Sequence, residues 1–154
     1  MDIYLLRHGE AEPRGSGIAE AARELTPRGR QDVRRVIRFA RGRKFSPEAI
    51  VSSRYVRARQ TADIAAKLLG VAEVRESRNL LPSGKPSALW RELQRISGIE
   101  QVLLVGHEPQ MSNFLAFLIG GAGRIDIKKG ALLRIQVSAA GAQLKWMIVP
   151  ALVR

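Results

Sequence analysis

The sequence predicts an α/β sandwich of three layers, with a mostly parallel mixed sheet, helices on both faces and an antiparallel hairpin at the C-terminus. Two unbroken apolar runs, residues 3–6 and 102–105, are typical of strands that are buried on both faces. Strand-like and helix-like segments alternate along the chain, which favours parallel strands joined by helices. Residues 131–137 and 143–149 instead alternate between apolar and polar side chains, which predicts two antiparallel strands.

The composition is that of an ordinary globular domain. The chain has 154 residues, of which 45% are hydrophobic and 26% charged, and we expect a single domain over residues 1–154. It contains no cysteine, which excludes disulfides, zinc–thiolate sites and a cysteine nucleophile. The N-terminal apolar run is too short for a signal peptide, and residues 114–119 fall far short of a bilayer span of ~20 residues. We therefore expect a soluble cytoplasmic protein without membrane association.

The charge points to anionic partners. The formal net charge is +12, and arginine outnumbers lysine. Because guanidinium groups make bidentate contacts with phosphate and carboxylate, nucleic acid, acidic protein and phosphorylated substrates are all candidates. Solubility alone can also produce a basic surface, so the charge by itself selects none of them.

The first half of the chain is predicted to contain three strands and two helices. The first helix has clear end signals, with Thr26 as N-cap, Pro27 at the first helical position and Gly42 after its last turn. Its exposed face carries a row of arginines, which is more often a solvated face than a binding surface: Arg30, Arg34, Arg38 and Arg41. The predicted elements are strand 3–6, a loop over 11–25 with a helical turn near 19–23, helix 27–41, strand 49–51, helix 54–69 and a weak strand 71–74.

The second half is predicted to contain two helices, one buried strand and the hairpin. Pro109 and Gly120 mark the ends of the second of these helices. The predicted elements are helix 88–96, strand 102–105, helix 109–119 and strands 131–137 and 143–149 joined by a loop over 138–142. In the last strand Leu144, Trp146 and Ile148 are expected to share one side.

Reactive side chains follow the predicted parallel strands. Arg7 and His8 follow the first strand, Ser52 and Ser53 end the second, and His107 follows the fourth. Ligands in open α/β sheets bind beyond the carboxyl ends of the strands, so these groups are expected to converge, together with Arg57 in the first turn of the next helix and with Arg54 as a possible third guanidinium. Such a cationic cluster would repel itself without an anion. We also expect free backbone N–H groups at the start of the helix that begins at Pro109, and a phosphoryl group is the natural ligand.

Four ordered segments resemble the histidine phosphatase superfamily. They are Leu6-Arg7-His8-Gly9-Glu10, Leu25-Thr26-Pro27-Arg28-Gly29, Ser52-Ser53 leading to Arg57-Ala58-Arg59-Gln60-Thr61, and Val105-Gly106-His107. The small size and the segment Leu81-Pro82-Ser83-Gly84 are most similar to the SixA-type phosphohistidine phosphatases, which implies a phosphoglycerate mutase-like fold.

This resemblance implies a role for each matching residue. His8 would be the nucleophile that becomes phosphorylated, Arg7 and Arg57 would grip the phosphoryl oxygens, and His107 would stabilise charge in the transition state. Gly9 would also contact substrate, and Arg54, which stands where the family usually has proline, could add a further contact. The resemblance implies no metal and no cofactor, and a phosphorylated protein or small phosphorylated molecule as partner.

The source of a proton for the leaving group stays open. Hydrolysis of an alkyl phosphate requires an acid, and Glu10 and Glu108 beside the histidines are the candidates, although each could instead orient a neighbouring cation. Asn79 stands where relatives often have glutamate. Phosphohistidine has a better leaving group, so we expect a phosphohistidine phosphatase. A small-molecule phosphomonoesterase and a binding module for phosphoproteins or nucleic acid without turnover are the alternatives, nucleic acid being the less favoured, and the sequence leaves the oligomeric state open.

Overall fold

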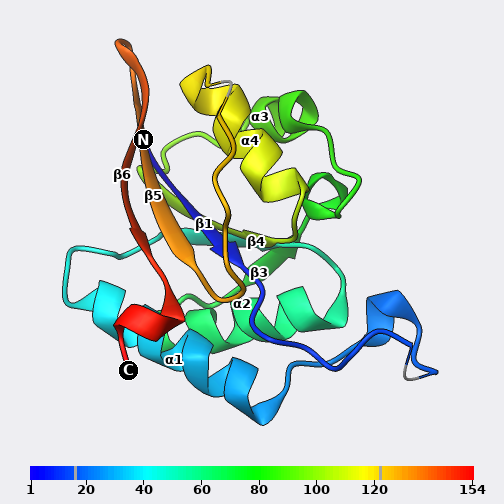
Figure 1. The fold of residues 1–154 in the computed structure, drawn as a ribbon. Coiled ribbons are helices and arrows are strands. Elements are labelled where there is room, and N and C mark those ends of the chain that lie inside the picture. The colour runs from blue at the N-terminus through cyan, green and yellow to red at the C-terminus, as the bar shows by residue number, and fades with distance from the viewer. Residues whose placement is uncertain (16, 122) are drawn as a thin grey trace.

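The computed structural model describes residues 1–15, 17–121 and 123–154, and it has a three-layer α/β architecture (Figure 1). One mixed sheet of six strands has the order β3-β2-β4-β1-β5-β6. β1 to β4 run parallel, while β5 is antiparallel to β1 and β6 to β5, which confirms the predicted sheet and its C-terminal hairpin. The strands are β1 (Asp2–Arg7), β2 (Ala49–Ser52), β3 (Val74–Glu76), β4 (Gln101–Gly106), β5 (Leu132–Ser138) and β6 (Gly141–Ile148).

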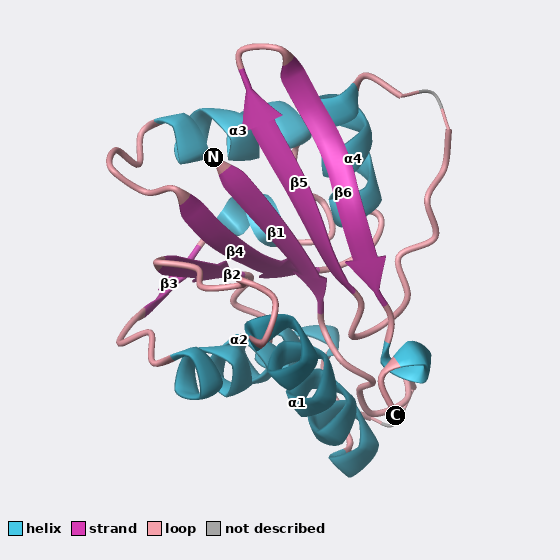
Figure 2. Ribbon diagram, turned by 90° about the vertical axis from the view of Figure 1, so that its left-hand side faces the viewer, coloured by secondary structure: helices cyan, strands magenta, loops and turns pink. Residues whose placement is uncertain are grey.

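Helices cover both faces of this sheet, with α1 and α2 on one side and α3 and α4 on the other (Figure 2). Among the described residues, no helix is long and apolar enough to cross a membrane. The helices are α1 (Pro27–Arg41), α2 (Val56–Leu69), α3 (Pro86–Gln94) and α4 (Gln110–Ile119).

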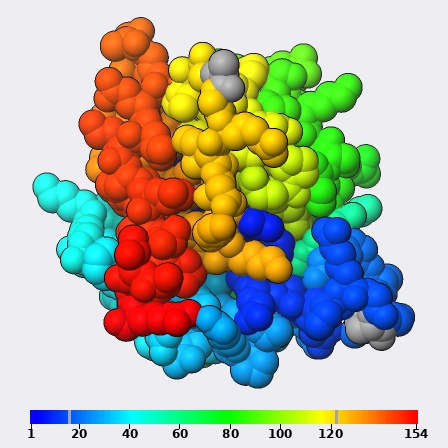
Figure 3. Space-filling model, in the orientation of Figure 1, coloured from blue at the N-terminus to red at the C-terminus, as the bar shows by residue number. Residues whose placement is uncertain are grey.

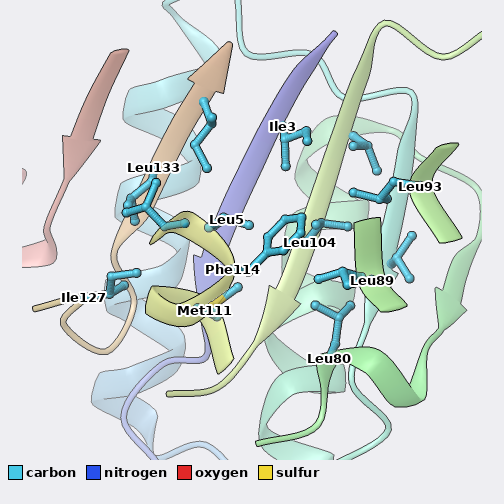
Figure 4. Packing of buried hydrophobic residues seen from close by; sticks show 14 of the residues in the cluster. Ile3, Leu5, Leu80, Leu89, Leu93, Leu104, Met111, Phe114, Ile127 and Leu133 are labelled. Atoms are coloured by element: carbon cyan, nitrogen blue, oxygen red, sulfur yellow. The ribbon is translucent and has the colours of Figure 1, made fainter. Parts of the chain in front are cut away.

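The unbroken apolar runs are strands buried on both faces, as predicted. Successive side chains of a strand point to opposite faces, so Ile3 and Leu5 of β1 join the cluster under α3 and α4, whereas Tyr4 and Leu6 join the cluster under α1 and α2. In Figure 4, Phe114 of α4 packs over β1 and β4 in the first of these clusters. The sheet is thereby fixed between two apolar layers, and its strand ends are held in place.

Both predicted ends of α1 and the predicted last residues of α2 and α4 are confirmed, whereas the other four helix ends differ by one or two residues. Thr26 caps α1 by accepting a hydrogen bond from the N–H of Gly29 at 3.0 Å. α2 begins at Val56 instead of residue 54, because Tyr55 is in the extended conformation and is the N-cap. α3 begins at Pro86, earlier than predicted, since proline fits the first turn of a helix.

Three expectations for the strands are wrong. The hairpin loop predicted over 138–142 is reduced to residues 139–140, because Ser138 pairs with Gly141 and Val137 with Ala142. The weak strand predicted over 71–74 lies later in the chain, as β3 (Val74–Glu76). After the C-cap at Gly70, residues 71–73 form a loop. In the hairpin, the pairing register passes from Trp146 to Leu144 and skips Lys145. This bulge places Leu144 against the α3–α4 cluster, whereas Trp146 and Ile148 pack toward α1 and α2.

The predicted loop over residues 11–25 contains a single helical turn, Glu20–Ala22, as expected. Its ends are held together by an antiparallel bridge between Ala11 and Leu25. Ser16 of this loop lies outside the described residues.

Candidate active site

The C-terminal ends of three parallel strands, β1, β2 and β4, lie side by side at one edge of the sheet. β4 lies between β1 and β2, and the N–H groups of His8 and Ser53 donate to the carbonyls of Gly106 at 3.0 Å and Val105 at 2.9 Å. A cavity of about 290 Å³ opens beside these strand ends. Its wall contains the four residues predicted to converge there: Arg7, His8, Arg57 and His107.

His8 is buried, and its hydrogen bonds fix its tautomer. Nδ1 lies 2.7 Å from the carbonyl oxygen of Gly9, which can only accept, so Nδ1 carries the proton. Nε2 of the neutral ring is then a lone pair, and it accepts from Nε of Arg57 at 3.3 Å. Burial, followed by the nearby charges of Arg57 and Arg7, lowers the pKa of His8 to about 3 despite the opposing hydrogen bond to Gly9. The ring is therefore neutral at pH 7, with an electron pair on Nε2 that is directed at Arg57.

His107 lies against His8, with 5.0 Å between the ring centroids. Its Nε2 is hydrogen-bonded to Oγ of Ser53 at 2.7 Å, and its buried Nδ1 has no partner in the described part of the chain. Burial, and then the neighbouring His8 and Arg57, lowers the pKa of His107 to about 2. At pH 7 the positive charge of the site therefore comes from the guanidinium groups and not from His107.

Arg57 is almost fully buried, at 2% exposure, in the first turn of α2. While Nε faces His8, Nη1 donates to the carbonyl of Glu20 at 2.7 Å and Nη2 to Oε1 of Glu20 at 3.0 Å. Burial lowers the pKa of Arg57, but it remains a cation. One edge of the guanidinium thus faces the nucleophile candidate, and the other is held by residue 20.

Arg7 contributes a second guanidinium at the end of β1. Its Nη1 donates to the carbonyl of Ile127 at 2.7 Å, and its buried Nε has no partner among the described residues. The segment after α4 therefore closes one side of the site, and Gly130 donates to the carbonyls of both Arg7 and His8. In Figure 3 this segment, in gold and orange, lies beside the blue residues that follow β1.

Glycines allow the backbone to pack closely behind the site. A Cβ on Gly9 would lie 2.9 Å from the carbonyl oxygen of Gly29 and from Cγ2 of Val33. A Cβ on Gly29 would collide with the backbone of Glu10. The N–H of Gly9 donates to Oγ1 of Thr61 at 3.2 Å, so it supports the strand end and is already engaged.

The two candidate proton donors, Glu10 and Glu108, differ in their position relative to the cavity. Glu10 lies outside the residues that line the cavity and accepts from Oγ1 of Thr26 at 3.1 Å. Glu108 lines the cavity, but its two carboxylate oxygens accept from the N–H and Oγ of Ser112 at 3.0 and 2.6 Å. This contact and the bond from the N–H of Met111 to the carbonyl of His107 occupy N–H groups of α4 that we had expected to be free for a ligand.

Other cations lie either on the exposed surface or in the wall of the cavity. Arg54 is exposed and lies outside the cavity lining, so the structure does not bring it to the other site residues. Arg34, Arg38 and Arg41 are also exposed on α1, away from the cavity. The sequence reasoning missed Glu12, Arg14, Arg23 and Lys129 in the cavity wall, and no pattern around them in the sequence marks them.

The arginine cluster contains its own counter-charge, which we did not predict. Nε and Nη2 of Arg23 donate to the two carboxylate oxygens of Glu20 at 3.0 and 2.7 Å, and the same carboxylate accepts from Arg57. Glu20 therefore offsets the repulsion that we expected between unpaired guanidiniums. Within residues 1–15, 17–121 and 123–154, no group of His, Asp and Glu side chains has the arrangement of a metal site.

Comparisons with known proteins show which family and fold this chain resembles. A family model, histidine phosphatase superfamily (branch 1), matches residues 3–81. The phosphohistidine phosphatase SixA of Escherichia coli is 24% identical over 154 residues, covering 97% of this chain and 94% of that protein.

Solved structures share the fold over the whole chain. A structure of the protein histidine phosphatase SixA complexed with tungstate superposes with a TM-score of 0.92 at 22% identity and covers 100% of both chains. The alpha-ribazole phosphatase of Shigella flexneri gives a TM-score of 0.79 at 17% identity and covers 97% of both chains. The same fold thus occurs in phosphatases that are named for a protein substrate and for a small molecule.

Proposed function

The chain belongs to the histidine phosphatase superfamily, and from this premise we propose that it hydrolyses phosphohistidine in a protein through a phospho-His8 intermediate. The observation that carries the proposal is the lone pair on Nε2 of His8, which faces Nε of Arg57 in a cationic cavity. A neutral imidazole in this position can attack phosphorus directly.

The proposed reaction has two displacements at phosphorus. In the first, Nε2 of His8 forms a bond to phosphorus while the P–N bond of the substrate breaks, and the leaving imidazole retains the electron pair and a proton. In the second, water attacks phosphorus, the bond to His8 breaks and orthophosphate leaves. Guanidinium groups that are fixed before the reaction stabilise the charge on the phosphoryl oxygens.

Arg57 and Arg7 are proposed to bind these oxygens, and His107 to donate from its unpaired Nδ1 when Oγ–H of Ser53 donates to its Nε2. The guanidiniums supply positive charge in this proposal without a metal ion or cofactor. Gly9 is proposed to act on substrate only indirectly, because its N–H is bonded to Thr61.

The choice of phosphohistidine rests on the placement of the acids. Glu10 is bonded to Thr26 outside the cavity, and both oxygens of Glu108 accept hydrogen bonds from Ser112. A phosphoramidate with a protonated ring tolerates a weak acid better than an alkyl phosphate does. The second candidate, a small-molecule phosphomonoesterase, is favoured by Glu12, whose place in the cavity wall would suit a proton donor.

A turnover assay tests the proposal. Wild-type protein and His8→Ala are compared on a phosphohistidine-containing carrier protein, on aryl phosphate and on a panel of sugar and nucleotide phosphates. We expect acid-labile phosphate on wild-type protein after rapid quench and none on the variant. Arg59→Ala is the matched control, since Arg59 pairs with Asp63 and Glu76 outside the cavity lining. Full aryl phosphatase activity of His8→Ala would disprove the mechanism, and faster turnover of sugar phosphates than of phosphohistidine would favour the second candidate.

A further inference from the structure

We propose that Glu20 is a positioning residue, which holds Arg57 in the orientation that the phosphoryl group requires. The inference rests on the proposed function and concerns a residue outside the motifs that carry the family resemblance. Glu20 is 37 positions from Arg57 in sequence, and only the tertiary structure brings them together.

The contacts of Arg57 divide into two edges. Both terminal nitrogens are hydrogen-bonded to a single residue, Glu20. Nη1 donates to its backbone carbonyl at 2.7 Å, and Nη2 donates to its carboxylate at 3.0 Å. This grip leaves Nε directed at Nε2 of His8, 3.3 Å away, which is where the transferred phosphoryl group would be attached. A rotation of the guanidinium would break both contacts with Glu20, so residue 20 selects the edge that is presented to substrate.

Glu20 is itself held by Arg23. The two carboxylate oxygens accept from Nε and Nη2 of Arg23 at 3.0 and 2.7 Å, a planar bidentate pair. Nη1 of Arg23 donates to the carbonyl of Glu12 at 2.6 Å, and Arg23 as a residue is buried, with 6% exposure. The hydrogen bonds from Arg23 lower the pKa of the Glu20 carboxyl, which keeps it ionised. Arg23 is thus a fixed support, and not only a surface cation.

The backbone around these residues is anchored independently of the contact. The N–H of Glu12 donates to the carbonyl of Glu24 at 2.9 Å, and that of Thr26 to the carbonyl of Glu10 at 3.0 Å. The N–H of Leu25 donates to the side chain of Gln60 on α2 at 2.8 Å. Loss of the Glu20 carboxylate should therefore remove one of the two contacts that hold the Arg57 guanidinium, and its counter-charge, without releasing the segment.

The charges around Glu20 also support its role in positioning Arg57. Arg23 and Arg57 are both buried, and each carries a positive charge that the other opposes. The carboxylate between them removes this repulsion, so a neutral amide at position 20 would leave the two guanidiniums to move apart. Displacement of Arg57 by about 1 Å is enough to cost ~10²-fold in rate, since phosphoryl transfer depends on fixed geometry.

The test is a double-mutant cycle between Glu20→Gln and Arg57→Ala. We expect Glu20→Gln to lower kcat/KM on the phosphohistidine-containing carrier protein by about 10- to 100-fold, mainly through a lower kcat. In the Arg57→Ala background, the same substitution should change kcat/KM by less than about 2-fold, because its target has been removed. Glu76→Gln, which removes the carboxylate of an exposed Arg–Glu pair outside the cavity lining, is the control and should match wild type.

If the fold reductions in kcat/KM of the two single substitutions multiply in the double variant, the residues act independently and the proposal is wrong. A Glu20→Gln variant with activity within about 2-fold of wild type would also overturn it. Unfolding midpoints of all variants show whether the fold is intact, and the Glu20 side chain is 43% exposed, so its replacement leaves no cavity in the core.

The same double-mutant cycle is measured on the affinity for orthophosphate by calorimetry. If wild-type protein turns over no phosphorylated substrate but the cycle in orthophosphate affinity still shows coupling, the proposed function fails and the positioning role stands. Absence of coupling in both measurements rejects the positioning role.

Discussion

Lowering the pH from 7.5 to 5 is expected to destabilise the ligand-free protein through its two histidines. These are the only histidines in the chain, and there is no cysteine, so few other groups titrate in this range. Burial sets the folded pKa of His8 at about 3 and that of His107 at about 2, whereas an exposed histidine in the unfolded chain has a pKa of about 6.5. Between pH 6.5 and about 3 the unfolded chain therefore binds protons that the native protein excludes.

The magnitude follows from this difference in proton binding. The free energy of unfolding rises with pH wherever the unfolded state binds more protons, so it must fall on acidification. At pH 5, about 1.5 units below the unfolded pKa, each histidine costs about 2 kcal/mol, and the pair about 4 kcal/mol. This is a large part of the stability of a small domain, which is about 5–15 kcal/mol.

Urea unfolding at intervals between pH 7.5 and 5 measures the effect. The buffers contain no phosphate or sulfate, because a bound oxyanion would add stability of its own. His107→Gln should reduce the slope of unfolding free energy against pH by about half, and His8→Gln should do the same. A free energy that stays constant within about 0.5 kcal/mol over this range would refute the burial of two neutral histidines, as would a full wild-type slope in both variants.

Two further substitutions test the supports of the site. Gly29→Ala should destabilise the protein by at least about 2 kcal/mol in urea unfolding, because the new Cβ collides with the backbone of Glu10. Gly42→Ala, whose nearest contact would be 3.8 Å away at φ −69°, is the control, and equal stabilities would contradict the close packing. Ser53→Ala removes the partner of Nε2 of His107, and we expect it to cost about 1–3 kcal/mol of stability and to lower kcat. Unchanged kinetics would show that Ser53 does not orient His107.

Local patterns in the sequence were sufficient for most of the fold. The runs ending at Leu6 and Val105 have strand character because both of their faces are buried, and this requires an unbroken apolar stretch. The cap at Thr26 and the stops at Gly42 and Gly70 are equally local, since each depends on residues within one helical turn. The convergence of Arg7, His8, Arg57 and His107 followed from the rule that parallel strands end at one edge.

Other features needed the tertiary structure. The sequence left Arg54 as a possible further contact, and only the structure shows that Arg54 is exposed outside the cavity lining, whereas Arg57 in the first turn of α2 is buried in it. The bulge at Lys145, which sends Leu144 and Trp146 to opposite faces, also has no local signature in a strand that alternates throughout.

The sequence by itself determined the strands, the helices and the residues that meet at their ends, because hydrophobic periodicity and capping act over a few positions. Only the tertiary structure decided how the arginines are held. Glu20 and Arg23 lie in a loop without periodicity, and the contact of Glu20 with Arg57 depends on how that loop folds back over α2. Hydrogen bonds between distant side chains need no pattern along the chain, so the support of the candidate site, unlike its central residues, could not be found from the sequence.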